Sequence, residues 1–188
     1  MIKPALALLL LAAPAFASGF TPSRPDEEVT AAAPMEGLYA AAGAGPALLI
    51  TNAGNALALD AELRLGYSFN PGMQIYLAGS TDSGSISGQT VRLNTVAAYL
   101  QYHLHVGRSV LVYSRAGIGL GFGPLSINAP NDTTGLGLAA AGGLGLEIRL
   151  TPSILIGPEL FYRNGSIKSG QYGLDLQVIG LQLGIFYY

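Results

Sequence analysis

The chain has 188 residues, which suits one domain, and it contains no cysteine, so disulfides and thiolate metal sites are excluded. Half of the residues are hydrophobic and only 11% are charged, against about 25% in a typical soluble domain, and Lys3 and Lys168 are the only lysines. This leaves too few charges for an ordinary soluble surface, and the net charge of −2 argues against a nucleic-acid partner.

The first 17 residues have the pattern of a secretory signal peptide. Lys3 supplies the positive charge, 5–13 is a short apolar run, and Ala15-Phe16-Ala17 matches a cleavage site. A run this short cannot span about 30 Å of hydrocarbon, so a membrane anchor is disfavoured. We expect export, cleavage before Ser18 and a flexible periplasmic lead-in over 18–36, which is rich in proline, alanine and acids.

From position 37 onward, eight segments alternate with the period of two that is typical of β-strands. We expect them at about 37–50, 57–70, 73–81, 91–106, 110–122, 134–150, 154–164 and 172–188. Short turns at 70–72, 107–109 and 151–153 alternate with longer polar segments at 51–56, 82–90, 123–133 and 165–171. Outer-membrane barrels have short periplasmic turns and longer external loops, so this order places both chain ends in the periplasm.

The alternation separates an aliphatic face from a polar face, as Leu63 and Arg64 illustrate. A soluble lipocalin-like barrel would turn the aliphatic face inward and leave glycine, alanine and a few charges outside. A membrane barrel turns that face to lipid, which explains both the glycines and the scarcity of lysine. We therefore expect an all-β fold, a closed eight-stranded antiparallel up-and-down transmembrane β-barrel over 37–188.

The polar face places a charged cluster in the lumen. Its members are Asp60, Glu62, Arg64, His103, His105, Arg115, Glu147, Arg149, Glu159 and Arg163. Eight strands enclose a space that side chains just fill, and buried charges must be paired. Because four acids face four arginines, we expect a structural salt-bridged plug without an open pore; a narrow ion pathway along these charges is the alternative.

Two strands depart from the simple pattern. Arg92 and Asn94 fall on the outward parity of the fourth strand, so we expect them above the hydrocarbon. The last strand changes parity near Val178 and Ile179, which indicates a bulge or the point where the strand leaves the membrane.

Aromatic residues gather near the expected periplasmic edge, where such rings prefer to lie: Tyr67, Phe69, Tyr102, Phe186, Tyr187 and Tyr188. With its signal peptide, eight strands and aromatic C-terminal end at 183–188, the chain resembles the small outer-membrane β-barrel family that includes opacity-type adhesins and the OmpA and OmpX barrels. The resemblance covers roughly residues 37–188. It implies outer-membrane lipids as surroundings and the barrel assembly machinery as a partner, with Phe186 and Tyr188 in the terminal strand as the assembly signal.

Catalysis and metal binding find little support in the sequence. Some eight-stranded outer-membrane barrels modify lipid A with a serine, a histidine and an acid near the outer rim. Here His103 and His105 lie beside the Gly107 turn, about 25 Å across the membrane band from Ser80, Asp82 and Ser83. A nucleophile and its base must lie within about 3 Å of each other. The two histidines share one face but lack a third ligand, so they make a weak metal site.

We therefore expect no enzyme activity, no metal and no cofactor. The chain is predicted to be a monomeric outer-membrane barrel with a structural or surface-interaction role, whose loops could contact an external ligand. A narrow channel and a lipid-modifying enzyme remain the alternative functions.

Overall fold

The computed structural model describes residues 36–52, 54–70, 72–86, 88–106, 109–124, 134–169 and 172–188. The predicted signal peptide and nearly all of the predicted lead-in lie outside these residues. No helix in the described ranges is long and apolar enough to cross a membrane.

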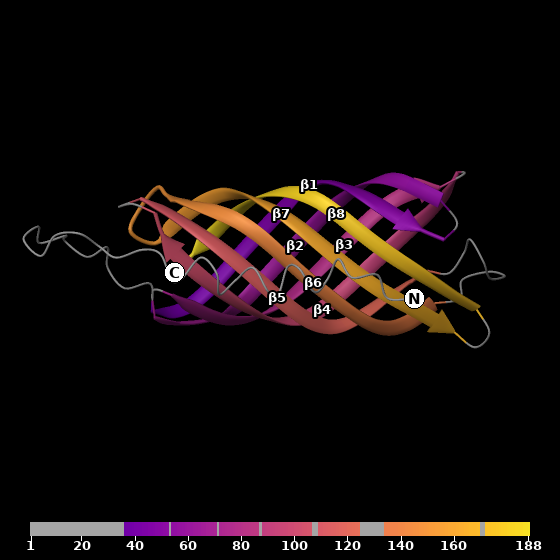
Figure 1. Ribbon diagram of the computed structural model, residues 1–188, viewed down its shortest axis with the longest axis horizontal. Coiled ribbons are helices and arrows are strands. Elements are labelled where there is room, and N and C mark those ends of the chain that lie inside the picture. The colour runs from indigo at the N-terminus through magenta and orange to yellow at the C-terminus, as the bar shows by residue number, and fades with distance from the viewer. Residues whose placement is uncertain are drawn as a thin grey trace, which may run out of the picture. The chain divides into compact units, whose positions relative to one another are not determined.

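Eight antiparallel strands close into one barrel, as Figure 1 shows, which confirms the predicted fold class. The strands are β1 (Gly37–Thr51), β2 (Gly54–Asn70), β3 (Met73–Ile86), β4 (Gln89–His105), β5 (Val110–Pro124), β6 (Thr134–Arg149), β7 (Ile154–Ser169) and β8 (Tyr172–Tyr187). Each strand pairs with its neighbour in the chain, and β8 pairs with β1. No sheet edge is left, as a bilayer requires, because lipid cannot bond to free backbone groups.

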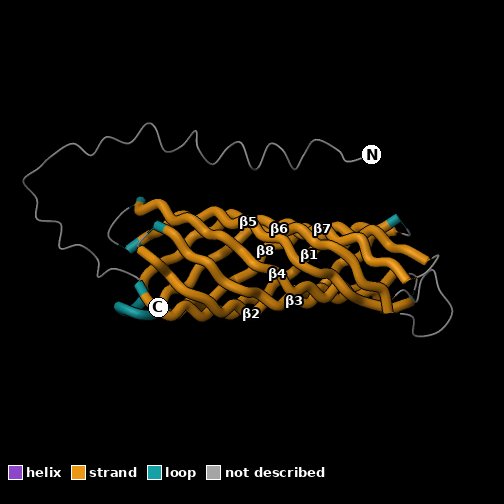
Figure 2. Tube along the Cα trace, turned by 90° about the horizontal axis from the view of Figure 1, so that it is seen from below, coloured by secondary structure: helices purple, strands orange, loops and turns teal. Residues whose placement is uncertain are grey.

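The barrel is strongly staggered. Starting at Ala40 in β1 and following paired residues across the other seven strands returns to β1 at Ile50, ten residues further along. Such a stagger tilts the strands by about 35–45° from the barrel axis. Figure 2 shows the strands running obliquely around the barrel. As a result, side chains that are distant in the sequence reach the same level of the lumen.

The two rims of the barrel carry different connections. The terminal rim holds Gly37 and Tyr187, the ends of the first and last strands, and the connections 71–72, 106–109 and 150–153. The distal rim holds the connections 52–53, 87–88, 125–133 and 170–171. Four longer loops were predicted there, and three of these predictions are wrong, because β2 begins at Gly54, β3 continues to Ile86 and β7 to Ser169.

The missed strand ends are polar outside and apolar inside. In β3 and β4, Ser85 and Arg92 face outward, whereas Ile86, Val91 and Leu93 are buried inside. This is the reverse of the pattern that a lipid-facing strand shows, and it is typical of a sheet whose outer face meets water. Small polar residues are also typical of loops, and these strand ends were therefore predicted as loops.

Of the two alternatives predicted for the parity change in β8, a bulge or the point where the strand leaves the membrane, the bulge is absent. The pairing of β8 with β7 continues without interruption from Tyr172 to Tyr187, and Val178 points inward while Ile179 points outward. What changes at this point is the chemistry of the inward face, which becomes apolar toward the distal rim.

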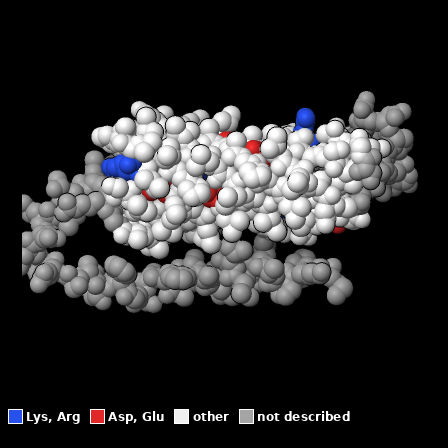
Figure 3. Space-filling view, turned by 90° about the horizontal axis from the view of Figure 1, so that it is seen from above, with Lys and Arg blue, Asp and Glu red and all other residues white. Residues whose placement is uncertain are grey.

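Aliphatic side chains form the outer wall of the barrel, as predicted. Leu63 is 69% exposed, whereas Arg64, the next residue, is 4% exposed. Tyr67, Phe69 and Tyr102 are also exposed, toward the terminal rim. Figure 3 shows one face of the molecule, where charged atoms are confined to a few small patches. The apolar wall fits a bilayer and could not serve as the surface of a soluble domain.

Replacing Leu63 by Arg tests the outer wall. Leu63 lies near the middle of β2, so Leu63→Arg should lower the free energy of unfolding in lipid vesicles by about 2–4 kcal/mol. Ser85→Arg, on the outer face near the distal rim, should cost about 0–1 kcal/mol. Urea unfolding of the two variants measures the difference, and equal costs at both positions would contradict a membrane-spanning wall.

Candidate functional site in the barrel lumen

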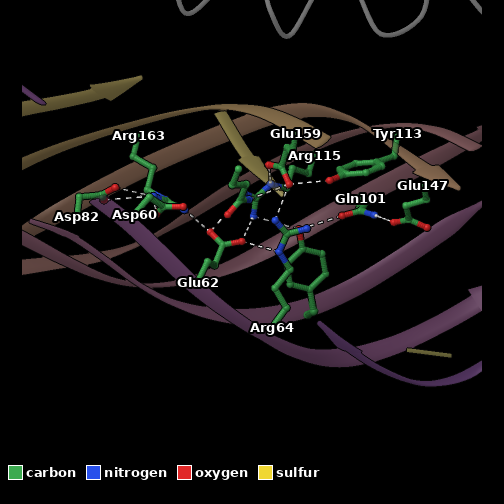
Figure 4. Close-up of polar contacts among 12 residues, drawn as sticks. Asp60, Glu62, Arg64, Asp82, Gln101, Tyr113, Arg115, Glu147, Glu159 and Arg163 are labelled. Atoms are coloured by element: carbon green, nitrogen blue, oxygen red, sulfur yellow. Dashed lines mark hydrogen bonds and ion pairs between the residues drawn. The ribbon is translucent and has the colours of Figure 1, made fainter. Parts of the chain in front are cut away.

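Seven charged side chains from four strands meet inside the barrel, and we call them the ionic layer. They are Asp60, Glu62 and Arg64 from β2, Asp82 from β3, Arg115 from β5, and Glu159 and Arg163 from β7. None of them is more than 5% exposed. Figure 4 shows their contacts as one continuous network. These residues sit on the inward parity of their strands, which is why the tilted register brings them together.

Glu62 lies at the centre of the ionic layer and receives all three guanidinium groups. Arg64 Nε donates to Glu62 Oε1 over 2.5 Å, Arg115 Nη1 donates to the same oxygen over 2.7 Å, and Arg163 Nη2 donates to Oε2 over 2.5 Å. Arg64 and Arg115 also donate to Glu159, which joins β2, β5 and β7 across the lumen. Charge-assisted bonds of this kind are about twice as strong as neutral ones.

On the distal side of the layer, Arg163 holds two aspartates. Its Nη1 atom donates to Asp60 Oδ1 over 2.5 Å and to Asp82 Oδ1 over 2.9 Å. Asp82 was assigned to a loop in the sequence analysis, so its place here is a correction. The signal that could have identified it is parity, because Asp82 continues the inward series of β3 and lies directly opposite Asp60 in β2.

Aromatic rings stack on the guanidinium groups. The Cζ atom of Arg115 lies 4.7 Å from the ring centroid of Tyr99, and that of Arg163 lies 4.2 Å from the centroid of Phe161. The Cζ atom of Arg64 lies 5.6 Å from the centroid of Phe186. Cation–π contacts of desolvated groups can each contribute about 2 kcal/mol. Phe186 was expected at the membrane interface, but it is buried in the lumen; of the three terminal aromatic residues 186–188, only Tyr187 is exposed.

A smaller polar cluster lies nearer the terminal rim, around the buried carboxylate of Glu147. His103 Nε2 lies 3.2 Å from Glu147 Oε1, Gln101 donates to the same oxygen over 3.3 Å, and the hydroxyl of Tyr188 donates to Oε2 over 2.8 Å. Tyr76 joins this cluster to the ionic layer, because it donates to Gln101 over 3.0 Å and accepts from Arg115. Tyr188 therefore belongs to the lumen rather than to the lipid interface.

Two members of the predicted cluster do not join it. His105 is exposed at the end of β4, and Arg149 is half-buried at the end of β6. Both have the inward parity, but their strands end at the terminal rim, where an inward side chain reaches the barrel mouth. The sequence predicted four acids facing four arginines in the lumen. The ionic layer contains four acids but only three arginines, because Arg149 lies at the barrel mouth.

Glycines in β6 make room for the ionic layer. A Cβ atom on Gly143 would lie 2.3 Å from Glu159 Oε1 and 3.1 Å from Arg115 Nε. A Cβ atom on Gly145 would lie 2.3 Å from Cζ of Tyr113, whose hydroxyl donates to Glu159 over 2.6 Å. The glycines of β6 thus leave space for the long side chains of Arg115, Tyr113 and Glu159, which come from β5 and β7.

Apolar side chains close the lumen on both sides of the charges. We call the cluster toward the distal rim the distal apolar layer: Ala47, Leu49, Ala56, Ala58, Ile86, Val91, Leu93, Phe161, Ile167, Leu174, Leu176 and Val178. The terminal aromatic layer consists of Tyr39, Tyr76, Ala78, Ala97, Tyr99, Leu111, Tyr113, Leu155 and Phe186. Both layers are almost fully buried, so the lumen is filled along most of its length.

The histidine and the acids that the sequence analysis weighed for catalysis or metal binding are engaged with other lumen side chains. His103 contacts Gln101, Glu147 and Tyr188, and Asp82 contacts Arg163. These are the contacts of a packed interior rather than of a nucleophile and its base. Among the residues that the structure describes, no group of three or more His, Asp or Glu side chains could hold a metal ion.

Comparison with known proteins places this architecture in a family. The family model for the outer membrane protein beta-barrel domain matches residues 4–185. The solved structure of Neisserial surface protein A is similar in fold, with a TM-score of 0.64, 17% sequence identity, and coverage of 80% of this chain and 96% of that chain. No curated protein sequence matches the chain.

Two further structures give lower scores. Ail from Yersinia pestis has a TM-score of 0.48 at 15% identity, covering 81% of this chain and 100% of that chain. The N-terminal barrel domain of OprF from Pseudomonas aeruginosa has a TM-score of 0.40 at 16% identity, covering 77% and 96%.

Arg115→Met tests the ionic layer. The substitution keeps much of the side-chain volume but leaves Glu62 and Glu159 short of a counter-charge in a buried site. We expect the free energy of unfolding to fall by about 3–5 kcal/mol, measured by urea unfolding in vesicles. Arg92→Met, on the outer face of β4, should change it by no more than about 0.5 kcal/mol. Equal effects at the two positions would rule out a stabilising role for the buried pairs.

Proposed function

Because this chain belongs to the outer membrane protein beta-barrel family, we propose that it is a monomeric, non-enzymatic barrel of the bacterial outer membrane with a structural or surface-contact role. After export and removal of residues 1–17, both chain ends lie in the periplasm and the distal rim faces the outside. Two observations support this orientation: the longest connection between strands, 125–133, joins strand ends at the distal rim, and the strands continue there with polar outer faces, as Ser85 and Arg92 show.

The filled lumen carries the proposal that the barrel is not a channel. An ion crossing it would have to separate salt bridges such as that of Arg163 with Glu62, and then pass Leu93, Ile167 and Leu176. The charged side chains of the ionic layer bond to one another across the lumen, so they do not form a row of hydrated charges that could line an ion path. Charges arranged in this way hold strands together instead of conducting ions.

Neutral groups dominate the distal surface, which bears on any external partner. The connections at the distal rim contain no lysine or arginine, and Arg92 and Lys168 are the cationic residues of the adjoining strand ends. A surface of this composition does not attract polyanions strongly. We propose that an external partner is contacted through hydroxyl and amide groups, such as those of Ser85 and Asn94, rather than through charge.

The terminal strand is the proposed signal for the barrel assembly machinery. In the folded barrel, Phe186 and Tyr188 are turned into the lumen, whereas Ile185 and Tyr187 face outward. The assembly machinery would therefore have to contact Phe186 and Tyr188 before β8 pairs with β1 and closes the barrel. Ile185 and Tyr187 remain exposed on the outer wall after closure.

Planar-bilayer recording tests the closed lumen. We expect the purified barrel to give no reproducible conductance steps at protein amounts where a porin control conducts. Leu100→Ala, a change on the outer wall, should be equally silent. Stable steps that disappear in Arg115→Met or Glu147→Gln would overturn the plug and establish the narrow channel.

Cysteine labelling tests the orientation, and the absence of natural cysteine makes the background clean. Ser85→Cys, near the distal rim, should react with a membrane-impermeant maleimide on intact cells, because its side chain is exposed above the apolar wall. Ser109→Cys, exposed between β4 and β5 at the terminal rim, should react only after the outer membrane is permeabilised. The opposite pattern would show that the barrel is inserted the other way round.

A further inference from the structure

The ionic layer has an excess of one negative charge. Its acids are Asp60, Glu62, Asp82 and Glu159, and its bases are the three arginines named above. All seven are buried between two apolar layers, so bulk water and counterions cannot compensate the difference. An isolated ionised carboxylate in such a medium is too costly to persist. One positive charge must therefore be supplied from elsewhere.

The excess is localised at Asp60 and Asp82. Glu62 and Glu159 each accept hydrogen bonds from two or more donors, including arginines, whereas the two aspartates share the single Nη1 atom of Arg163. Their bonded oxygens cannot be farther apart than the sum of the two distances, 2.5 and 2.9 Å, which is 5.4 Å. The residues are also direct partners in the β2–β3 register.

One oxygen of the aspartate pair is buried and has no hydrogen-bond partner. Within the described part of the chain, Oδ2 of Asp60 is buried and makes no hydrogen bond. Buried carboxylate oxygens are normally bonded, so this atom points to a bound species that carries a hydrogen. Two carboxyl groups held this close in a low dielectric repel each other when both are ionised, and the single guanidinium that they share compensates only one of the two charges, so such pairs commonly hold one proton.

We propose that Asp60 and Asp82 form a binding site for one proton, which makes the ionic layer neutral. The charged groups that face the pair are Arg163 from β7 and Glu62 from β2. Arg115 from β5 binds Glu62 and stacks on Tyr99 from β4. Val178 from β8 is the register partner of Arg163, and the buried inward residues Ala47 from β1 and Ala139 from β6 are uncharged. The proton rather than a metal ion fits the site, because Nη1 of Arg163 already donates to both carboxyl groups and its positive charge would repel a metal cation.

Infrared spectroscopy of the folded barrel tests the proposal directly. With 13C-labelled aspartate, the wild-type barrel at neutral pH should show the carbonyl stretch of a protonated carboxyl group, separate from the carboxylate bands. Asp82→Asn should abolish that band, because Asp60 then pairs alone with Arg163. Asp175→Asn, on the exposed outer face of β8, should leave the band unchanged. A wild-type spectrum without the band overturns the proposal.

The pH dependence of unfolding gives a second measurement. At neutral pH unfolded aspartate has already released its proton, whereas the folded pair would still hold one, so the folded barrel must lose stability as the pH rises. Relative to Asp82→Asn, the unfolding equilibrium constant of the wild type should increase tenfold per pH unit from neutral pH upward, until the folded pair ionises. An identical pH profile for both proteins, or wild-type stability that depends on sodium or potassium instead of pH, would overturn the proton site.

Discussion

Buried charges must be paired, and in this barrel that requirement joins strands that are far apart in the chain. Glu62 in β2 binds Arg115 in β5 and Arg163 in β7, so a single carboxylate ties together three sectors of the wall. Because side chains alternate with a period of two, a slip of one residue would move these charges into lipid and the outer leucines into the lumen. The ionic layer therefore specifies the register as well as filling the space.

The same strands serve two environments along their length. Near the middle and the terminal rim they are apolar outside and largely polar or aromatic inside, whereas near the distal rim Ile167 and Leu174 point inward and Lys168 and Asp175 point outward. Lipid demands the first pattern and water the second. One continuous hydrogen-bonded ladder accommodates both, because the backbone pairing of β7 and β8 does not depend on which face is apolar.

Parity, which is visible in the sequence, identified the faces but not the depth of each residue. Leu63 and Arg64 point outward and inward as predicted. His105 and Arg149 also have the predicted parity, yet they lie at the barrel mouth, because the ends of β4 and β6 cannot be located from alternation alone. Asp82 was predicted in a loop because its serine, threonine and glycine neighbours are typical of a turn. In the structure these neighbours belong to β3, which continues beyond the aliphatic part of the outer wall.

The distal apolar layer bears on which positions of this protein tolerate substitution during evolution. Leu93, Leu176 and their neighbours give the distal part of the barrel an apolar core of its own, so this part does not depend on an outward aliphatic face for its packing. Positions on its outer surface, such as Ser83 and Ser166, bear little of the folding energy and are free to drift. The polar outer face of this part of the barrel could thus change in sequence while the same strands and the same inner packing are kept.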